Sequence, residues 1–492
     1  MTRLIGWAAF VSSLMLVVGC VKAPETNAPA NQADARVQDS TPKKSAEQEP
    51  GTGPQAIVKP EVPVKVPAKK RDSERDPEIF SVFAGVINGI DFSQNGRMMA
   101  TVWSTDIGYG FGARAWSIPD GKPVTPLLLR LDDYDPHIIK FHPDCGLVAT
   151  GNKSGTIVVW KVPEAEWVWT YPSGVGPVWS LEFSPDGRYL VAAAGEKCDL
   201  GQRKFGVAVV IDLTERKLAF PPLCHDKEGA VVHATFSRDG TLIATSTQYG
   251  SIRVWNAKSG KKDDDMPVFE HGDSLSQLFF SSDSGSLVSV SHLWSGKNSR
   301  GARVWNVGAK KEADPALMSG PGVFQARVTP KFDRIVTADR NGHVQIWDAK
   351  TGKTAAPLIH QRDKIFRIDL SADGQKLLTA GDDSAFLWDI QTGEQLAGPF
   401  RHGGTIHHAT FSPDGAKFLT AGTGGIQVWN SAGGPATIPL LNKASASTGY
   451  ARFTPDGKNV VTGAESARGL HIYETCKQLK LWSLEASSKG KP

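Results

Sequence analysis

The chain has 492 residues, with 55 Lys and Arg against 51 Asp and Glu and a formal net charge of +4. So small an excess over this length identifies no charged partner and does not favour nucleic-acid binding. Beyond the N-terminus, no apolar run approaches the about 20 residues of a membrane-spanning helix, so the rest of the chain is not expected to cross a membrane in that way.

Residues 1–19 have the features of a targeting segment. Arg3 precedes a 15-residue apolar run, Leu4–Val18, which is short for a bilayer span and typical of a signal-peptide core. Residues Val17–Cys20, Val-Val-Gly-Cys, resemble the cleavage box of bacterial lipoproteins. This resemblance implies cleavage before Cys20, lipidation of Cys20 and anchorage in a bacterial envelope membrane, outside the cytoplasm and facing the periplasm in a Gram-negative cell. The alternative is an ordinary secretory signal in which Cys20 is incidental.

Residues 20–77 are predicted to form a disordered tether. Residues 21–77 contain no Phe, Tyr or Trp, and eight prolines precede Pro77. Such a segment cannot bury enough apolar surface to offset the entropy lost on ordering. Its basic patch, Lys69–Arg71, is followed by Asp72, Glu74 and Asp76, which favours a solvated tether over an arm that binds nucleic acid.

From residue 78 to residue 484 the chain repeats one unit, which is clearest at residues 409–429. A short apolar strand ends at Phe411, and the Ser-Pro-Asp-Gly sequence of Ser412–Gly415 then suits a type I turn. Lys417–Gly422 is expected to return as a second strand, and Ile426–Trp429 alternates as a third. One such antiparallel sheet cannot bury both of its faces, so its copies are expected to stack.

The unit occurs nine times. Its turns lie at Ser93–Gly96, His142–Gly146, Ser184–Gly187, Ser237–Gly240, Ser281–Gly285, Thr329–Lys331, Ser371–Gly374, Ser412–Gly415 and Thr454–Gly457. Its third strands end at Trp116, Trp160, Ile211, Trp255, Trp305, Trp347, Trp388, Trp429 and Trp482. These strand ends are 41 to 53 residues apart, close to the about 40–45 residues of a four-stranded propeller blade.

These motifs resemble those of the WD-repeat β-propeller family, in its bacterial form, over about residues 78–484. The Trp-Asp pair itself occurs only at Trp347-Asp348 and Trp388-Asp389. The resemblance implies an all-β fold, a single closed propeller of four-stranded antiparallel blades, with eight or nine blades from the nine units. Residues 485–492 are expected to be a disordered tail.

The family often locks a blade with a hydrogen-bonded set of His, Thr or Ser, Trp and Asp. Two units match three members of the set, with His360, Thr379 and Trp388 in one and His402, Thr420 and Trp429 in the other. Three other units have Ser154, Tyr249 and Asn341 in place of the Asp. The blades are therefore expected to depend more on packing than on this polar set, with the repeated Trp side chains in the core.

The two ends of the repeat region are expected to meet. The chain ends soon after Trp482, which leaves the last blade without an outer strand. Ile79–Phe83 precedes the first blade as an outer strand would, so it is predicted to pair beside Leu479–Trp482 and remove two sheet edges.

Four units have a long connection between the second and third strands, at Trp103–Ala113, Gly195–Gly206, His292–Gly301 and Gly463–Gln478. In the family these connections lie on one face, so the insertions are expected to crowd one rim. They supply the candidate partner contacts Tyr109, Phe111, Arg203, Lys204, Trp294, Arg300, Arg468 and Tyr473. Aromatic and Arg residues on loops suit a recognition surface, and surface loops that have drifted without a partner are the alternative.

Family topology also brings two cysteines together. Cys198 lies in the insertion of unit three, and Cys224 lies in the loop that leads into unit four. Both loops are expected on the same face in neighbouring positions, and an exported protein meets oxidising conditions. A disulfide between them is predicted, with two unpaired thiols as the alternative.

No group of residues predicts catalysis or a cofactor. His233, His407 and His408 fall in innermost strands, but a metal needs three or four converging ligands and units four and eight are far apart in the ring. Carboxylates such as Asp144, Asp186 and Asp414 recur with the turns and are therefore interpreted as structural. The sequence contains no Gly-x-Ser-x-Gly elbow, His-Glu-x-x-His helix or phosphate-binding Gly loop.

The sequence therefore predicts an envelope-anchored scaffold, not an enzyme, that binds a protein partner through loops on one face. Two alternatives remain open, a periplasmic propeller enzyme of the quinoprotein or hydrolase type and a propeller that binds a glycan or another small ligand. An enzyme would need convergent polar residues at the channel mouth, and small-ligand binding would need the insertion aromatics to surround a pocket.

Overall fold

The computed structural model describes residues 78–80, 86–104, 111–118, 120–128, 136–172, 176–199, 204–262, 266–272, 275–291, 301–313, 323–349, 351–423, 425–434, 438–441, 448–465 and 476–483. All of them belong to one compact unit that includes residues 75–492. Within these ranges the chain forms strands and no helix. None of the described residues therefore forms a helix that could span a membrane.

The strands follow one another as short antiparallel segments. The first third contains β1 (Glu78–Phe80), β2 (Val86–Phe92), β3 (Met98–Ser104), β4 (Phe111–Ser117), β5 (Pro136–Phe141), β6 (Leu147–Asn152), β7 (Thr156–Lys161), β8 (Trp167–Pro172), β9 (Val178–Phe183), β10 (Tyr189–Asp199), β11 (Lys204–Asp212) and β12 (Lys217–Leu218). The middle contains β13 (Leu223–Glu228), β14 (Val231–Phe236), β15 (Leu242–Thr247), β16 (Ser251–Asn256), β17 (Phe269–Glu270), β18 (Leu275–Phe280), β19 (Ser286–Ser291), β20 (Ala302–Asn306), β21 (Lys311–Glu312), β22 (Val323–Val328), β23 (Arg334–Asp339), β24 (His343–Asp348) and β25 (Ile359–His360). The last part contains β26 (Ile365–Leu370), β27 (Lys376–Gly381), β28 (Ser384–Asp389), β29 (Gln395–Arg401), β30 (Ile406–Phe411), β31 (Lys417–Gly422), β32 (Gly425–Asn430), β33 (Ile438–Leu441), β34 (Thr448–Phe453), β35 (Asn459–Glu465) and β36 (Cys476–Ser483).

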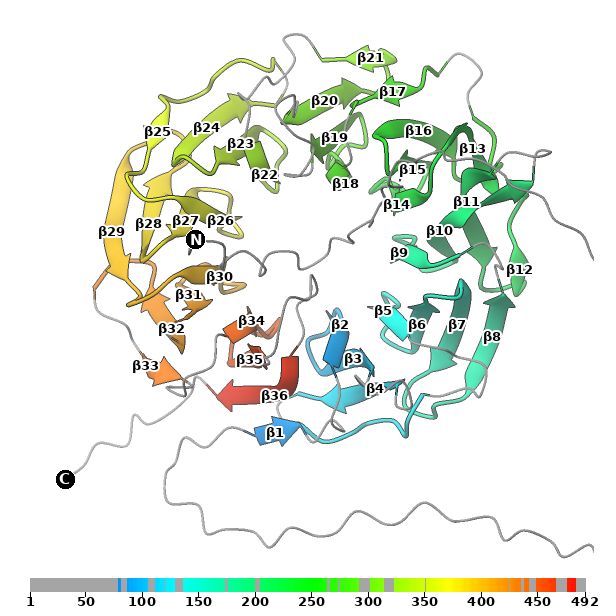
Figure 1. Cartoon of the computed structure of the whole chain (residues 1–492), viewed down its shortest axis with the longest axis horizontal. Coiled ribbons are helices and arrows are strands. Elements are labelled where there is room, and N and C mark those ends of the chain that lie inside the picture. The colour runs from blue at the N-terminus through cyan, green and yellow to red at the C-terminus, as the bar shows by residue number, and fades with distance from the viewer. Residues whose placement is uncertain are drawn as a thin grey trace, which may run out of the picture. The chain divides into compact units, whose positions relative to one another are not determined.

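These strands build the sheets of a β-propeller. Six sheets have four strands in sequence order, one has five, and one has seven because it combines the first and last units. Each described sheet is open, and none closes on itself. Figure 1 shows the first strand of every unit, from β2 to β34, nearest the middle, with the later strands towards the outside. The predicted all-β fold of four-stranded antiparallel blades is confirmed.

The first and last units share one sheet. β1 pairs antiparallel with β36, with Ile79 opposite Lys480 and Phe80 opposite Leu479. β2 also pairs with β36, where Ile87 lies opposite Cys476 (Figure 1). The pairing predicted for the segment before the first blade is therefore confirmed at Ile79 and Phe80, and the remaining residues of that segment lie outside the described ranges.

All nine predicted turns form, because in each the fourth residue donates its backbone N–H to the carbonyl of the first. In the turn at Ser412, the hydroxyl donates to Asp414 Oδ1 at 2.5 Å and accepts the N–H of Lys417 at 2.9 Å. The fourth residue has a positive φ, 66° at Gly415, which glycine adopts without steric cost. The side-chain bonds thus hold the first and second strands in register at the turn.

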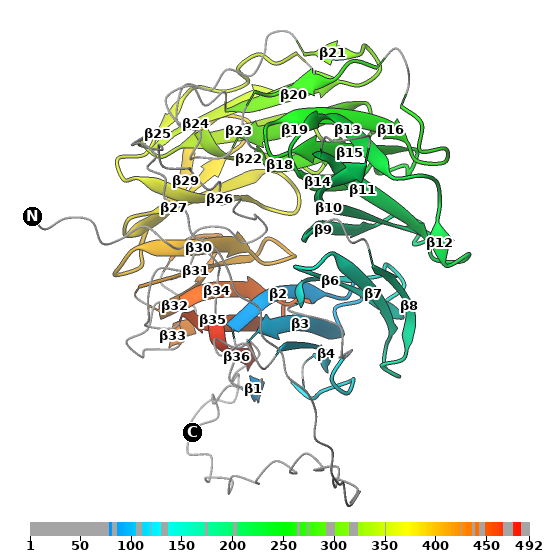
Figure 2. The same ribbon diagram turned by 45° about the vertical axis from the view of Figure 1, so that its right-hand side comes forward.

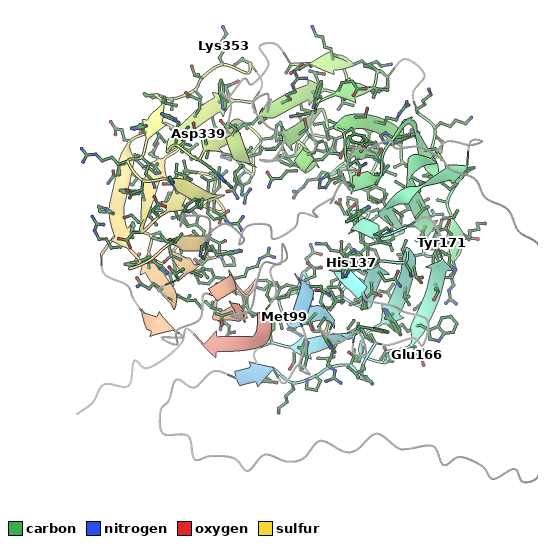
Figure 3. All side chains as sticks on the ribbon, viewed as in Figure 1. Met99, His137, Glu166, Tyr171, Asp339 and Lys353 are labelled. Carbon is green, nitrogen blue, oxygen red and sulfur yellow. The ribbon has the colours of Figure 1, made fainter. Side chains whose placement is uncertain are left out.

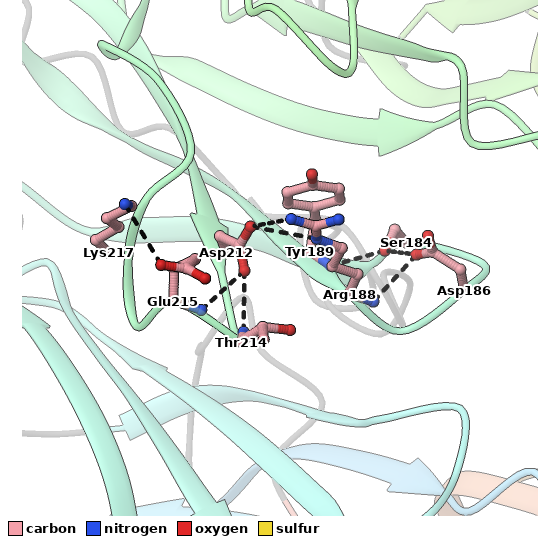
Figure 4. A network of polar contacts seen from close by, with 8 residues as sticks. All are labelled: Ser184, Asp186, Arg188, Tyr189, Asp212, Thr214, Glu215 and Lys217. Atoms are coloured by element: carbon pink, nitrogen blue, oxygen red, sulfur yellow. Dashed lines mark hydrogen bonds and ion pairs between the residues drawn. The ribbon is translucent and has the colours of Figure 1, made fainter.

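A second contact ties these turns to the loop after the third strand, as Figure 4 shows for unit three. Arg188 follows the turn and donates from Nε and Nη2 to Asp212 Oδ2, at 3.2 and 3.0 Å. Asp212 Oδ1 accepts the backbone N–H groups of Thr214 and Glu215, each at 3.0 Å. Both loops therefore lie at the same end of the strands, opposite the connection between the second and third strands.

The turn aspartates predict a loss of stability in acid. Burial acts to raise the pKa of Asp239, but hydrogen bonds from Ser237 and Thr241 outweigh it and lower the pKa to about 2. The pKa of Asp414 is lowered by the Ser412 hydroxyl first and then by the N–H of Ala416. A carboxyl group with a lower pKa in the folded state stabilises the fold above its unfolded pKa of about 3.9, and that stabilisation disappears as the pH falls through the folded value.

We therefore expect the melting temperature, followed by circular dichroism, to fall between about pH 4 and pH 2. Asp239→Asn removes one of these carboxylates, so it should lower the melting temperature at pH 7 more than at pH 2. Equal decreases at the two pH values would contradict this role for Asp239.

The core lies between neighbouring blades. One cluster joins Leu378 and Leu387 of the seventh unit to Phe411, Phe418 and Trp429 of the eighth. Phe418 is fully buried, and Trp429 is 6% exposed. Most of the other Trp residues that end third strands are likewise buried, so their predicted place in the core is confirmed for Trp116, Trp160, Trp255, Trp305 and Trp388.

The hydrogen-bonded set around the Trp side chain forms as predicted in the eighth unit but has a different member in the seventh. In the eighth unit, His402 Nδ1 lies 2.9 Å from Thr420 Oγ1, which accepts from Trp429 Nε1 at 2.9 Å, as predicted. In the seventh unit, Thr379 bonds to Gln361 and not to His360. His360 is exposed because side chains alternate along the outer strand, whereas the next residue points back into the blade.

Two further units contain the same arrangement, although the sequence analysis did not name them. His225 bonds to Thr245 at 2.7 Å, and Thr245 accepts from Trp255 at 2.8 Å. His271 and Trp305 both bond to Ser289, each at 2.8 Å. Burial lowers the pKa of His402 to about 4, so this buried histidine is neutral at neutral pH.

Candidate functional site

The predicted partner contacts lie mostly outside the described residues. Phe111 is the half-buried first residue of β4 and lies opposite Ser104. Lys204 is the first residue of β11 and lies opposite Asp199. The candidate contacts outside the described ranges are Tyr109, Arg203, Trp294, Arg300, Arg468 and Tyr473, and the proposed lipidation site Cys20 is outside them too.

The insertion of unit three is shorter than the sequence predicted. Gly195–Gly206 was expected to be a connection, but β10 runs to Asp199 and β11 starts at Lys204. The two strands thus continue as a hairpin, with a register shift between Ala194 and Cys198. Most of this insertion is therefore an extension of the blade, because alternating residues beyond Gly195 can still pair across the two strands.

The two cysteines of the predicted disulfide flank the same strand. Cys198 lies opposite Phe205 of β11, and Cys224 of β13 lies opposite Val207. Cys224 is disulfide-bonded. The side chain of Cys198 is outside the described side chains, so its pairing with Cys224 stays a prediction. Cys145 is a buried free cysteine.

Carboxylates on the innermost strands join neighbouring blades. Asp91 Oδ2 accepts the backbone N–H of Phe141 at 2.8 Å, and Asp91 Oδ1 lies 3.6 Å from Lys140 Nζ. Glu182 accepts from the N–H of Phe236 at 3.1 Å, and burial raises its pKa. Because these oxygens are used by backbone and side-chain donors of the next blade, their geometry serves packing between blades.

Residues His233 and His407 of the innermost strands take part in contacts between neighbouring blades. His233 Nε2 lies 3.3 Å from the carbonyl oxygen of Leu275, and Arg367 Nε donates to the carbonyl of His407 at 3.0 Å. Burial first, and then the charge of Arg367, lower the pKa of His407. Within the described ranges, no three His, Cys, Asp or Glu side chains come together as metal ligands do.

An aromatic strand at the outside of the second unit was not predicted from the sequence. Trp167, Trp169 and Tyr171 alternate along β8, and the first of them is 58% exposed. The rings of Trp169 and Tyr171 stack with centroids 5.8 Å apart. Figure 3 shows Tyr171 and Glu166 at the outer edge, whereas His137 lies towards the middle. The alternation of aromatic residues at this edge was the sequence signal that could have identified this surface.

The sequence analysis also missed a pocket at the turn end of the innermost strands. It encloses about 360 Å³ between the fourth, fifth and sixth units, and its walls include Arg238, Phe279, Arg327 and Phe332. Arg238 and Phe332 are turn residues that depart from the repeated Pro-Asp-Gly pattern. These two departures were the signal in the sequence that could have indicated the pocket.

Comparisons with known proteins agree with the repeat pattern. The family model described as "WD domain, G-beta repeat" matches residues 137–161, 166–199, 220–256 and 354–389. The chain is 25% identical over 313 residues to "Eukaryotic translation initiation factor 3 subunit I" of Aspergillus terreus, covering 59% of this chain and 84% of that protein. It is 28% identical over 171 residues to "Transcription initiation factor TFIID subunit 5" of Caenorhabditis elegans, covering 32% of this chain and 24% of that protein.

Among solved structures, the C-terminal WD40 domain of Sif2 is similar at 17% identity, with a TM-score of 0.49 and coverage of 70% of this chain and 95% of that one. The relatives named above are eukaryotic, so the bacterial type expected from the sequence stays a prediction. The family-model matches fall on strands β5–β10, β13–β16 and β25–β28, whose units include the buried Trp160, Trp255 and Trp388. These four matched segments are therefore similar to WD40 repeats.

Proposed function

We propose that this protein is a lipid-anchored scaffold of the bacterial envelope that binds a protein partner through the four insertions and catalyses no reaction. WD40 repeats suggest a protein-interaction scaffold. The observation that carries the proposal is topological. The pairs β3–β4, β10–β11, β19–β20 and β35–β36 all connect at the strand end opposite the repeated turns, so the insertions would be presented together.

The polar interior supports a scaffold over an enzyme. Asp91, Glu182 and Asp369 each accept a backbone N–H from the following blade. A general acid or base must instead reach a substrate atom. The similar initiation-factor subunits also support a role within an assembly, since their names describe them as subunits.

Anchorage rests on the N-terminal sequence alone. A lipidated Cys20 would hold the chain at the membrane, because each buried methylene contributes about 0.8 kcal/mol. Residues 20–77 would act as a flexible linker that lets the anchored propeller search for partners near the membrane.

We also infer that the nine units close as a single ring. Support comes from the β1–β36 and β2–β36 pairs and from the turns, where a Cβ on Gly96 would lie 3.2 Å from Pro455. A Cβ on Gly457 would lie at a similar 3.5 Å from Pro413 in the preceding unit. An experimental structure with Ile79 unpaired or with two separate rings would contradict this inference.

We further propose that Cys198 and Cys224 form a disulfide. The disulfide of Cys224 and the position of Cys198 across β11 support a bond between these two residues. Cα atoms more than about 7 Å apart in an experimental structure would exclude it.

The rim assignment predicts which variant loses its partners. The anchored full chain is crosslinked in cells, and recovered proteins are compared for the wild type and a variant with alanine at Tyr109, Trp294, Arg300 and Arg468. Trp, Tyr and Arg dominate interface hot spots, so we expect the variant to lose at least one partner by tenfold or more while keeping its melting temperature. The matched control has alanine at the exposed residues Arg97, Glu166, Lys217 and Lys353 and should keep every partner.

A folded rim variant that recovers every wild-type partner would reject the rim assignment. Cys20→Ser tests anchorage in the same cells and should move the protein from the membrane fraction to the soluble fraction. Retention in the membrane fraction would contradict lipidation at this residue. Turnover of a substrate by the purified propeller would reject the non-enzymatic role.

A further inference from the structure

The nine turns at the end of the first strands share a pattern from which six units depart, with Gln94 in the first, Cys145 in the second and Ala372 in the seventh, and with departures in three neighbouring units, the fourth to the sixth. In the ordinary pattern, Pro stands second and Gly stands fourth with a positive φ, as in Ser412–Gly415. The fourth unit has Arg238 in the place of Pro, the fifth has Ser282 there, and the sixth has Phe332 in the place of Gly. Figure 1 shows the innermost strands of these units, β14, β18 and β22, in succession.

The departures in the three neighbouring units meet in one pocket. Arg238, Ser282 and Phe332 all line the pocket of about 360 Å³ described above, together with Phe279 and Arg327 from the innermost strands. A Cβ on Gly374 would lie 2.9 Å from Pro330, so ordinary neighbouring turns pack closely. Beside Phe332, the preceding turn has the small Ser282 where Pro would stand. The pocket therefore lies where the packing of Pro against Gly is missing between the fifth and sixth units.

Phe332 has an unfavourable backbone conformation for its side chain. Its φ is +51°, in the left-handed region that is costly for a bulky residue and free of cost for glycine. The equivalent residue is glycine in six of the nine turns, with Cys145 and Ser284 as the only other exceptions. Strained residues of this kind cluster at binding sites, where the surrounding fold holds them in place.

The charges on the pocket wall are positive. Its lining contains the guanidinium groups of Arg238 and Arg327 and no carboxylate. Arg327 is held by its Nη1 bond to the carbonyl of Ala326 at 3.0 Å and lies 3.8 Å from Asp369. Arg238 is exposed and has no ion-pair partner in the part of the chain that the structure describes.

A second pocket at the same strand ends lacks these features. It encloses about 410 Å³ and is lined by Asp91, Phe92 and Arg452. Arg452 lies over the Phe92 ring at 5.7 Å, and Asp91 already faces Lys140 and the N–H of Phe141. Both Asp91 and Arg452 are thus engaged within the protein, whereas the first pocket contains the exposed Arg238, for which the described residues supply no ion-pair partner.

We propose that the pocket formed by Arg238, Phe279, Arg327 and Phe332 binds a peptide segment of a protein partner in which an acidic side chain adjoins a large apolar one. The carboxylate contacts Arg238 and Arg327, and the apolar side chain packs on Phe279 and Phe332. A guanidinium group suits a carboxylate because it offers paired donors, and aromatic rings supply apolar contact area. The site lies at the strand end opposite the insertions and does not depend on the proposed rim.

Synthetic peptides test the site on the full chain. A fluorescein-labelled decapeptide with Glu-Phe in a Gly/Ser background is titrated with the protein, and fluorescence anisotropy is followed beside Gln-Phe and Glu-Gly versions. We expect saturable binding of the Glu-Phe peptide and at least tenfold weaker binding of the other two. No saturable binding of the Glu-Phe peptide, or equal affinity for all three peptides, would overturn the proposal.

Variants assign the binding to this pocket. Arg238→Gln and Phe332→Gly should each weaken the Glu-Phe peptide at least tenfold, whereas Arg97→Gln, which removes an exposed guanidinium at the turn of the first unit, should leave its affinity within twofold. Phe332→Gly relieves the positive φ, so its melting temperature should stay within a few degrees of the wild type or rise. If that variant fails to fold, Arg238→Gln and the charge-neutral Gln-Phe peptide still decide whether the carboxylate of the peptide binds in this pocket.

The result is separable from the partner capture proposed above. The alanine variant of the rim should bind the Glu-Phe peptide with wild-type affinity, because its substitutions lie at the other strand end. Loss of peptide binding in the folded rim variant would assign the peptide to the rim and overturn the pocket site.

Discussion

Replacing Trp429 with alanine is expected to lower the free energy of unfolding by about 3–5 kcal/mol, the range for removing a buried aromatic side chain. Trp429 is 6% exposed and lies against Phe400 and Phe418, with ring centroids 5.4 and 6.3 Å away. Its Nε1 donates to Thr420, so the substitution leaves a cavity and also removes one of the two partners of a buried hydroxyl, the other being His402. Urea denaturation followed by tryptophan fluorescence and circular dichroism measures the change.

Trp167→Ala is the matched control for this substitution. Trp167 also lies in a strand but is 58% exposed, so its replacement should change the free energy of unfolding by no more than about 0.5 kcal/mol. Equal effects of the two substitutions would show that burial between the seventh and eighth blades does not set the cost at Trp429.

Gly381→Ala is expected to destabilise the fold by about 3 kcal/mol, at the upper end of the range for overpacked sites. Gly381 is the last residue of β27, opposite Ile365. A Cβ built there would lie 1.5 Å from the carbonyl oxygen of Lys364, so the backbone of two strands would have to separate. The same crowding recurs at Gly422, where a Cβ would lie 1.9 Å from the carbonyl oxygen of Thr405.

Gly308→Ala provides the comparison for Gly381. The nearest atom to a Cβ at Gly308 is Asn306 Oδ1 at 3.7 Å, which is an ordinary contact. Its free energy of unfolding should therefore stay within about 0.5 kcal/mol of the wild type, measured in the same urea titrations. A Gly381→Ala protein as stable as Gly308→Ala would mean that the first and second strands can move apart at little cost.

The turns explain why so much of the fold was predictable from the sequence. A turn at a strand end is decided by local residues, and Ser412–Gly415 carries the hydroxyl, the carboxylate and the glycine that its hydrogen bonds need. The prediction that His360 bonds to Thr379 was wrong. The sequence shows which residues lie near a strand end, but it does not show which of two neighbours points inward. Gln361, one residue later, has the inward position and the bond to Thr379.

The candidate sites were less predictable because they depend on contacts between units. Arg238, Phe279 and Phe332 come from three different repeats. They line one pocket only because the units that contain β14, β18 and β22 stack side by side. The rim contacts were named from local features, such as Trp294 in a long connection, and local features cannot say whether such a side chain faces a partner or its own loop. In the third unit, continued pairing of β10 and β11 turned most of a predicted loop into strand.

The pairing of β36 with both β1 and β2 makes the fold sensitive to the loss of this one strand. Strands β1 and β2 are synthesised long before their partner, since Ile79 and Ile87 pair with Lys480 and Cys476. A product truncated before residue 476 would leave the edges of β1, β2 and β35 open, and open strand edges favour aggregation and proteolysis. We therefore expect a chain that lacks β36 to aggregate or to be degraded faster than the chain that has it.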